Sequence, residues 1–107
     1  MPRLTARGKR APLHLTIDVS GQDAGGAPFA HRARTLNISG GGLCFESPRR
    51  LLAGARLTLH IQIPPPLRRH FAGRSLYRVK AVVCRIEHLE GAELSKIGAR
   101  FLEELEA

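Results

Sequence analysis

Short extended segments with alternating apolar side chains are the feature that most restricts the fold of this chain. In the clearest of them, apolar side chains recur at every second position, as at Leu57, Leu59 and Ile61. A period of two is typical of a strand with one buried face. Six such segments are separated by turn residues: 13–19, 29–38, 43–46, 57–63, 76–86 and 96–101. Six strands with almost no helical pattern predict a small all-β domain, either a closed antiparallel barrel or a sandwich.

Several details of these segments lead to further predictions. Segment 76–86 is long and its alternation blurs near Val82 and Val83, which predicts a bent or bulged strand. Residues 20–27 are predicted to be a flexible connection and residues 68–73 a basic loop. The last six residues, 102–107, are predicted to form about a turn of helix.

The positive charge of the chain is carried almost entirely by arginine. The formal net charge is +8, and Lys9, Lys80 and Lys96 are the only lysines among 17 basic residues. A guanidinium group is planar and forked, so this composition favours recognition of phosphate or guanine edges. Three arginines, Arg3, Arg7 and Arg10, lie in residues 1–11, a polar basic arm that is not expected to hold a fixed shape alone.

A polar, glycine-rich corner separates the second and third strand-like segments. It reads Asn-Ile-Ser-Gly-Gly-Gly over residues 37–42. Glycine has no Cβ and lets a ligand approach the main chain closely, while Asn37 and Ser39 can donate and accept hydrogen bonds. The corner is therefore a candidate site for a polar edge such as a nucleobase. The alternative is a hairpin corner whose polar side chains satisfy only their own backbone.

The arm and the corner together resemble the PilZ domain family. That family is described by Arg-x-x-x-Arg followed, after some twenty to thirty residues, by Asp/Asn-x-Ser-x-x-Gly. Arg3-Leu-Thr-Ala-Arg7 fits the first element, and Asn37, Ser39 and Gly42 fit the second. The segment Ile-Gly-Ala-Arg-Phe at 97–101 also looks like the last barrel strand of the family.

The resemblance implies a small six-stranded antiparallel PilZ-type β-barrel over residues 12–107, preceded by a flexible basic ligand-binding arm over residues 1–11 and ending in a short C-terminal helix. It implies binding of cyclic di-GMP, a bacterial second messenger, with the paired-arginine role on the arm. It also implies that Asn37 and Ser39 bind a guanine edge and that Gly42 permits close approach. Because Arg10 stands nearest the first strand, the working pair can be Arg3 with Arg7 or Arg7 with Arg10.

The expected function is that of a cytoplasmic receptor or adaptor, not an enzyme, whose arm becomes ordered on binding and signals to a downstream protein partner in motility or biofilm regulation. One alternative is a PilZ-like interaction module that has lost ligand binding. A less favoured one is a basic barrel that binds RNA or single-stranded DNA, because five aromatic residues leave few for base stacking.

Other kinds of site have little support in the sequence. Cys44 and Cys84 lie in apolar strand-like segments and are predicted to be buried free thiols, although the sequence leaves a disulfide open. No pair among the five histidines has metal-ligand spacing, so neither a metal nor a cofactor is expected. No nucleophile or Walker-type motif is present, and neither a signal peptide nor a membrane-spanning run is expected.

Overall fold

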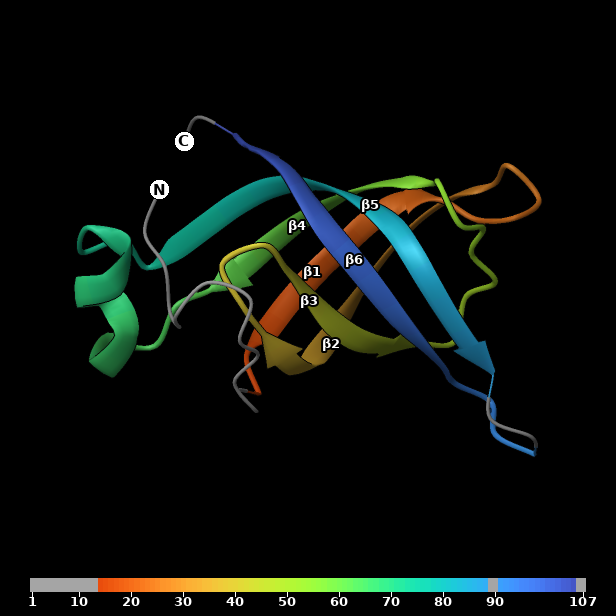
Figure 1. The fold of residues 1–107 in the computed structure, drawn as a ribbon, viewed down its shortest axis with the longest axis horizontal. Helices are drawn as coiled ribbons and strands as arrows, with labels where there is room; N and C mark the ends of the chain where they lie inside the picture. Colours follow the sequence, from red (N-terminus) through yellow and green to blue (C-terminus); the bar gives the residue numbers. More distant parts are fainter. Residues whose placement is uncertain (1–13, 89–90, 106–107) are drawn as a thin grey trace.

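Six antiparallel strands form a closed barrel in the computed structural model, which describes residues 14–88 and 91–105 (Figure 1). The strands are β1 (Thr16–Gln22), β2 (Pro28–Ile38), β3 (Gly42–Ser47), β4 (Arg56–Gln62), β5 (Leu76–His88) and β6 (Ser95–Glu104). Their order around the barrel is β1-β2-β3-β6-β5-β4, and β4 pairs with β1 to close it. The prediction of six strands in a small antiparallel β-barrel is confirmed.

The alternating apolar residues fill the interior. In β1 and β4 the side chains of Ile17, Val19, Leu57, Leu59 and Ile61 are almost completely buried. The intervening polar side chains face outward, as the period of two requires. Leucine, isoleucine and valine thus supply most of the core in a protein that has few aromatic residues.

Three β-bulges interrupt the otherwise regular ladders. In β2 Leu36 is an extra residue between the Thr35 and Asn37 pairs with β3. In β5 Cys84 is an extra residue between the Val83 and Arg85 pairs with β6. The third lies in β6 at Leu102. The bulge in β5 lies next to the blurred alternation at Val82 and Val83, so the predicted irregularity is confirmed. A bulge redirects the side chains next to it.

Three local predictions were wrong. Residues 102–104 continue β6 and do not form a helix, because β5 is long enough to pair Val79 with Glu104 and Lys80 with Glu103. The predicted basic loop at 68–73 is mostly the 3₁₀ helix η1 (Pro65–Phe71), which buries Phe71. The predicted connection at 20–27 is shorter, since β1 extends to Gln22.

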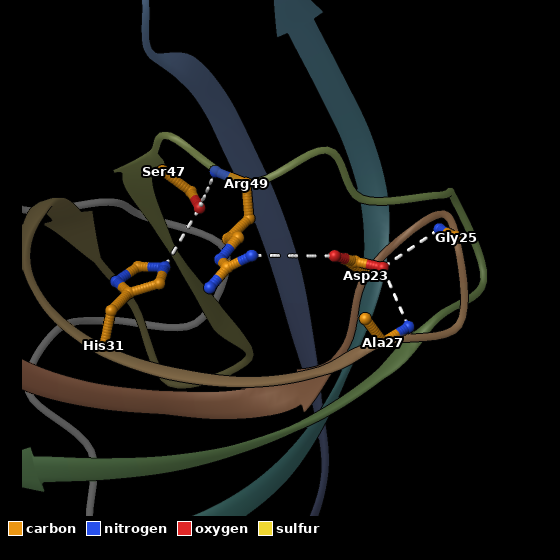
Figure 2. A network of polar contacts seen from close by, with 6 residues as sticks. All are labelled: Asp23, Gly25, Ala27, His31, Ser47 and Arg49. Atoms are coloured by element: carbon orange, nitrogen blue, oxygen red, sulfur yellow. Dashed lines mark hydrogen bonds and ion pairs between the residues drawn. The ribbon is translucent and has the colours of Figure 1, made fainter.

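A polar network closes the β1–β2 turn, at the end of the barrel opposite η1 (Figures 1 and 2). The Asp23 carboxylate accepts hydrogen bonds from the backbone N–H groups of Gly25 and Ala27, each at 3.0 Å. Its other oxygen lies 3.7 Å from the Arg49 guanidinium on the β3–β4 connection. The Ser47 hydroxyl accepts the Arg49 backbone N–H at 3.1 Å and lies 3.0 Å from His31 Nε2. These contacts join two loops and account for Asp23 without a catalytic role.

Candidate functional site

A row of four cross-strand partners runs over the outside of the barrel and contains the first residue of the corner motif. Asn37 of β2 pairs with Cys44 of β3, Cys44 pairs with Gly98 of β6, and Gly98 pairs with Arg85 of β5. In Figure 1 β6 lies between β3 and β5, as this order requires. The bulges at Leu36 and Cys84 flank the two ends of the row. Because bulges redirect neighbouring side chains, both ends of the row depart from regular strand geometry.

These residues line a groove of about 340 Å³ on the barrel surface. The full lining consists of Asn37, Cys44, Cys84, Arg85, Glu87, Lys96 and Gly98. The groove therefore has two cations and one anion along its sides. Gly98 contributes no side chain at its centre, and a Cβ built there would lie 3.3 Å from the Cβ of Arg85. The absence of that Cβ leaves the groove open between β3 and β5.

Ser39 has a role inside the corner itself. Its backbone N–H donates to the carbonyl oxygen of Gly42 at 2.8 Å. Its hydroxyl accepts the N–H of Gly41 at 3.2 Å and lies 3.4 Å from the Gly42 carbonyl oxygen. Local hydrogen bonds of this kind are what short hydroxyl side chains make in turns. Asn37 is the residue of the corner motif that lines the groove.

Gly42 is required by the packing of the neighbouring strand. A Cβ at Gly42 would overlap the backbone carbonyl oxygen of Ala99 and lie 3.2 Å from the Cα of Arg100. Neither Gly41 nor Gly42 has a positive φ. The strand that lies close to this glycine is thus β6. It pairs with β3 from the partners Gly42 and Arg100 onward. Approach of a ligand at Gly42 stays a prediction.

The three arm arginines, Arg3, Arg7 and Arg10, lie outside the described residues. The described chain starts at His14, which lines the larger cavity beside η1 and contacts β2. His14 Nδ1 lies 3.0 Å from the Thr35 carbonyl oxygen, and the Leu15 N–H donates to the buried Thr35 hydroxyl at 2.8 Å. Thr35 stands two positions before Asn37 on β2. These contacts hold the start of the described chain near the corner motif.

The cysteine prediction was wrong in part. Both cysteines are reduced, but Cys44 is half-buried and Cys84 is exposed. The bulge explains the difference, because it turns Cys84 and Arg85 outward in succession after the buried Val83. Alternation along a regular strand could not predict two consecutive outward side chains.

The sequence reasoning also missed Arg85 and Lys96 as groove residues. The only signal for Arg85 was the disturbed alternation in segment 76–86, which showed an irregularity but not which side chains it exposed. Lys96 pairs with Glu46 of β3 and Glu87 of β5. Lys96 lies beside the groove because β6 lies between those two strands. The local sequence pattern does not predict the order of the strands.

A larger cavity of about 540 Å³ lies between the start of β1, the end of β4 and η1. Its polar lining includes His14, Gln62, Arg68 and Ser75. The Arg68 Nε already donates to the Ile63 carbonyl oxygen at 3.0 Å, which fixes that side chain. None of the corner motif residues lines this cavity, so the smaller groove is the better candidate.

Two further classes of site were searched for. Within residues 14–88 and 91–105, no group of three or more histidine, cysteine, aspartate or glutamate side chains is arranged to hold a metal ion. In the same part of the chain, no helix has the length and apolar character needed to cross a membrane.

Comparison with known proteins gives one family and several similar folds. No curated protein sequence matches the chain. The structure of the inhibitor of motility (MotI/DgrA) from Bacillus subtilis is similar with a TM-score of 0.68 at 20% identity. That similarity covers 95% of this chain but only 45% of MotI, so this chain spans less than half of that protein's length.

Two separate PilZ domains are also similar in fold. The PilZ domain of CeSA from a cellulose-synthesizing bacterium has a TM-score of 0.58 at 15% identity, over 90% of this chain and 82% of that one. The PilZ domain of Escherichia coli YcgR, solved with c-di-GMP, has a TM-score of 0.56 at 18% identity, over 92% of this chain and 79% of that one. The family model for the PilZ domain matches residues 3–107. With nearly the whole length matched and the barrel in place, the chain belongs to the PilZ domain family.

Proposed function

We propose that the protein is a receptor for cyclic di-GMP and that a guanine of the ligand binds in the groove between Asn37 and Arg85. The observation that carries the proposal is the row of cross-strand partners that links these residues over β2, β3, β6 and β5. This row places Asn37 of the corner motif and the cation of Arg85 in the same groove. The E. coli PilZ domain with a similar fold was solved with c-di-GMP.

The chemistry of the groove suits this ligand. Cyclic di-GMP carries two guanines and two phosphates, so its binding site needs polar groups for base edges and cations for phosphates. The Asn37 amide can both donate and accept. Arg85 can fork onto guanine O6 and N7 or onto phosphate oxygens, and its plane can also stack on a base. Lys96 adds a second cation.

In this proposal the arm contributes the remaining contacts. The described chain starts at His14, which is held next to Thr35 and therefore near Asn37. Arg10 is four residues and Arg7 seven residues before His14, so extended chain spans of about 14 Å and about 24 Å bring them within range of the groove. Residues 1–11 act as the ligand-binding arm, and residues 12–107 form the barrel. Arg3, Arg7 and Arg10 bind phosphate or stack on guanine, with Arg7 common to both possible pairs.

Ordering of the arm is the proposed output. Fixing a chain segment costs on the order of 1–2 kcal/mol per residue, and charge-assisted hydrogen bonds to the ligand must offset this cost. We expect micromolar or tighter binding that weakens as salt is added. The new position of the arm then presents or covers a surface for a downstream protein.

Calorimetric titration of cyclic di-GMP tests this function. The full chain, Arg7→Ala and Arg50→Ala are titrated at two salt concentrations, with a generic single-stranded oligonucleotide in parallel. Arg50 is the matched control, because it is exposed and lies on the connection after β3, at the far end of that strand from the corner. We expect saturable binding by the wild type and Arg50→Ala, and none by Arg7→Ala.

Two other results would lead to different functions. Salt-dependent binding of the oligonucleotide without binding of cyclic di-GMP would indicate a nucleic-acid-binding barrel. Absence of both from a folded protein at low salt would indicate an interaction module that does not bind the ligand. One observation favours that second candidate, because the Ser39 hydroxyl is engaged within its own turn.

A further inference from the structure

One side of the barrel wall carries most of its positive charge. β2, β1, β4 and the part of β5 before the Cys84 bulge are neighbours around the barrel (Figure 1). The outward side chains of these strands, all of them in the described part of the chain, include one carboxylate, that of Asp18. They also include five cations: Arg32 and Arg34 of β2, Arg56 of β4, and Arg78 and Lys80 of β5. This surface is called the basic face below.

The rest of the wall has no such excess of positive charge. It consists of β3, β6 and the part of β5 after the bulge, and its charged side chains are Arg85, Lys96, Arg100, Glu46, Glu87 and Glu103. Lys96 is the cross-strand partner of both Glu46 and Glu87, and Glu103 borders the basic face as the partner of Lys80. Cations are therefore concentrated on the basic face and are not spread evenly over a chain of net charge +8.

A row of cross-strand partners runs through the basic face and has an arginine at each end. Arg32 pairs with Asp18, Asp18 with His60, and His60 with Arg78. Three strand spacings separate the two arginines, so their Cα atoms are about 14 Å apart. The Arg32 Nε lies 3.1 Å from an Asp18 carboxylate oxygen, but the two side chains are 67% and 45% exposed. Such an exposed ion pair is weak, so Arg32 can exchange it for an external carboxylate at little cost.

The basic face reaches the start of the described chain. The Arg34 Nη2 donates to the His14 carbonyl oxygen at 3.4 Å, and Arg34 pairs with Thr16 of β1. The proposed arm, residues 1–11, ends three residues before His14. In the proposed receptor, a change in the arm therefore takes place beside this face, where it can alter access to a partner.

We propose that the basic face docks an acidic segment of the downstream protein. The guanidinium fork matches a carboxylate with two parallel hydrogen bonds, which suits a face made mainly of arginine. An acidic segment can also place a neutral residue over Asp18, whereas the phosphate backbone of a nucleic acid carries continuous charge. That the segment belongs to the downstream protein rests on the proposed receptor function. The charge complementarity itself does not.

Two other polyanions fit this face less well. Its described outward positions hold no phenylalanine, tyrosine or tryptophan, and proteins that bind single-stranded nucleic acids stack bases on such rings. Leu76 is the only large apolar side chain exposed among the same positions. Binding to a membrane surface increases with the apolar area that is buried, so one leucine contributes little to it.

Fluorescence anisotropy of a labelled peptide of alternating glutamate and serine residues tests the docking, with the full chain and without nucleotide. Arg34→Gln/Lys80→Gln is compared with Arg50→Gln/Lys96→Gln, which removes one arginine and one lysine outside the basic face. We expect the first variant to bind the peptide about fivefold more weakly than the wild type and the second to bind like the wild type.

Removal of the one carboxylate should have the opposite effect. Asp18→Asn is expected to bind the peptide about twofold more tightly, because a repulsive charge is lost. Glu93→Gln is the control, since Glu93 is exposed on the connection between β5 and β6. Its affinity should stay that of the wild type. Equal gains in both variants would show that only net charge matters and would overturn the assignment of the basic face.

A labelled single-stranded oligonucleotide and vesicles of phosphatidylglycerol and phosphatidylcholine are tested in parallel. Tighter binding of either one, lost in Arg34→Gln/Lys80→Gln, would overturn the assignment of an acidic protein segment. Equal weakening of peptide binding in the two double variants, or no binding of the peptide by the folded wild type at low salt, would overturn the proposal. Failure to bind cyclic di-GMP in the separate calorimetric titration would instead overturn the receptor function and leave the peptide result valid.

Discussion

Gly98 of β6 and Arg85 of β5 are cross-strand partners, and a Cβ on Gly98 would stand 3.3 Å from the Cβ of Arg85. The position is just too close for an ordinary side chain, so a larger residue must displace Arg85 and also fill the groove. The bulge at Cys84 brings Arg85 into this position. One glycine and one bulge thus determine the shape of the candidate site.

Replacement of Gly98 by valine should fill the groove while the barrel remains folded. We expect the affinity for cyclic di-GMP to fall at least tenfold and the free energy of unfolding to fall by about 1–2 kcal/mol, since Gly98 is buried by its neighbours and overpacking there is moderately destabilising. Ala30→Val on the exposed face of β2 is the control and should change neither. Titration calorimetry and urea denaturation measure the two effects. Wild-type affinity in a folded Gly98→Val protein would exclude the groove as the binding site.

Arg85→Gln should weaken ligand binding without disturbing the fold. Loss of one partly exposed charge-assisted contact should lower the affinity about fivefold, on the order of 1 kcal/mol. The salt dependence of binding should also become shallower, because one cation fewer is screened. Arg50→Gln removes the same charge at a distant loop and should bind like the wild type. Identical salt dependence in both variants would show that Arg85 does not contact the ligand.

Gly42→Ala should destabilise the barrel whether or not a ligand is present. The new Cβ would overlap the Ala99 carbonyl oxygen, so β3 and β6 must separate locally. We expect a loss of about 2 kcal/mol in the free energy of unfolding, within the range for overpacked sites. Gly41→Ala is the neighbouring control, because a Cβ there has no atom within 4 Å, and its effect should stay within about 0.5 kcal/mol. Urea denaturation of the two variants should separate them clearly.

Stability at alkaline pH should depend on Tyr77. The pKa of its phenol is raised from 10.0 to about 12, mainly by burial and also by the nearby Glu104 carboxylate, while Arg74 acts in the opposite direction. Among the described residues its hydroxyl has no hydrogen-bond partner. Between pH 10 and pH 12 the unfolded chain therefore loses the phenol proton while the folded protein retains it. Stability should fall over this window, by on the order of 2 kcal/mol.

Tyr77→Phe removes this titration and tests its origin. The variant should be as stable as the wild type or more stable at pH 8, since it removes a buried hydroxyl without a described partner. Its stability should also fall less steeply between pH 10 and pH 12. Urea midpoints at several pH values measure both effects. Parallel curves for the two proteins would mean that other groups cause the alkaline loss.

Asp23 should stabilise the β1–β2 turn through its oxygen atoms more than through its charge. Asp23→Ala leaves the Gly25 and Ala27 N–H groups without their acceptor and should cost about 1 kcal/mol. Asp23→Asn keeps one acceptor oxygen and should recover most of that loss. The ion pair with Arg49 is long, at 3.7 Å, and contributes little. Thermal unfolding of both variants at low and high salt measures these effects. If Asp23→Asn lowered the unfolding temperature as much as Asp23→Ala does, the charge of Asp23 would matter more than its acceptor oxygen.

Much of the barrel could be predicted from local patterns, because burial on one face imposes a period of two. Segment 57–63 is an example, and the structure places β4 there with the predicted residues inward. The C-terminal residues could not be predicted in this way. The segment Leu-Glu-Glu at 102–104 has no strand alternation, and its conformation follows from pairing with Val79 and Lys80 of β5.

The candidate site could be predicted only in part, for the same reason. The corner containing Asn37 and Ser39 is continuous in sequence and could be recognised. Arg85, Lys96 and the exposed Cys84 depend on a bulge and on the position of β6 between β3 and β5. Neither property is encoded by residues close in sequence. The arm arginines lie outside the described residues, so their roles stay a prediction.

The strand order also has a consequence for synthesis of the protein on the ribosome. β3 and β5 both pair with β6, which comes after them in the chain, and β6 supplies the centre of the candidate groove. A nascent chain that stops before β6 has neither a closed barrel nor a complete groove. Competence to bind a ligand in this groove and completion of folding therefore arise together.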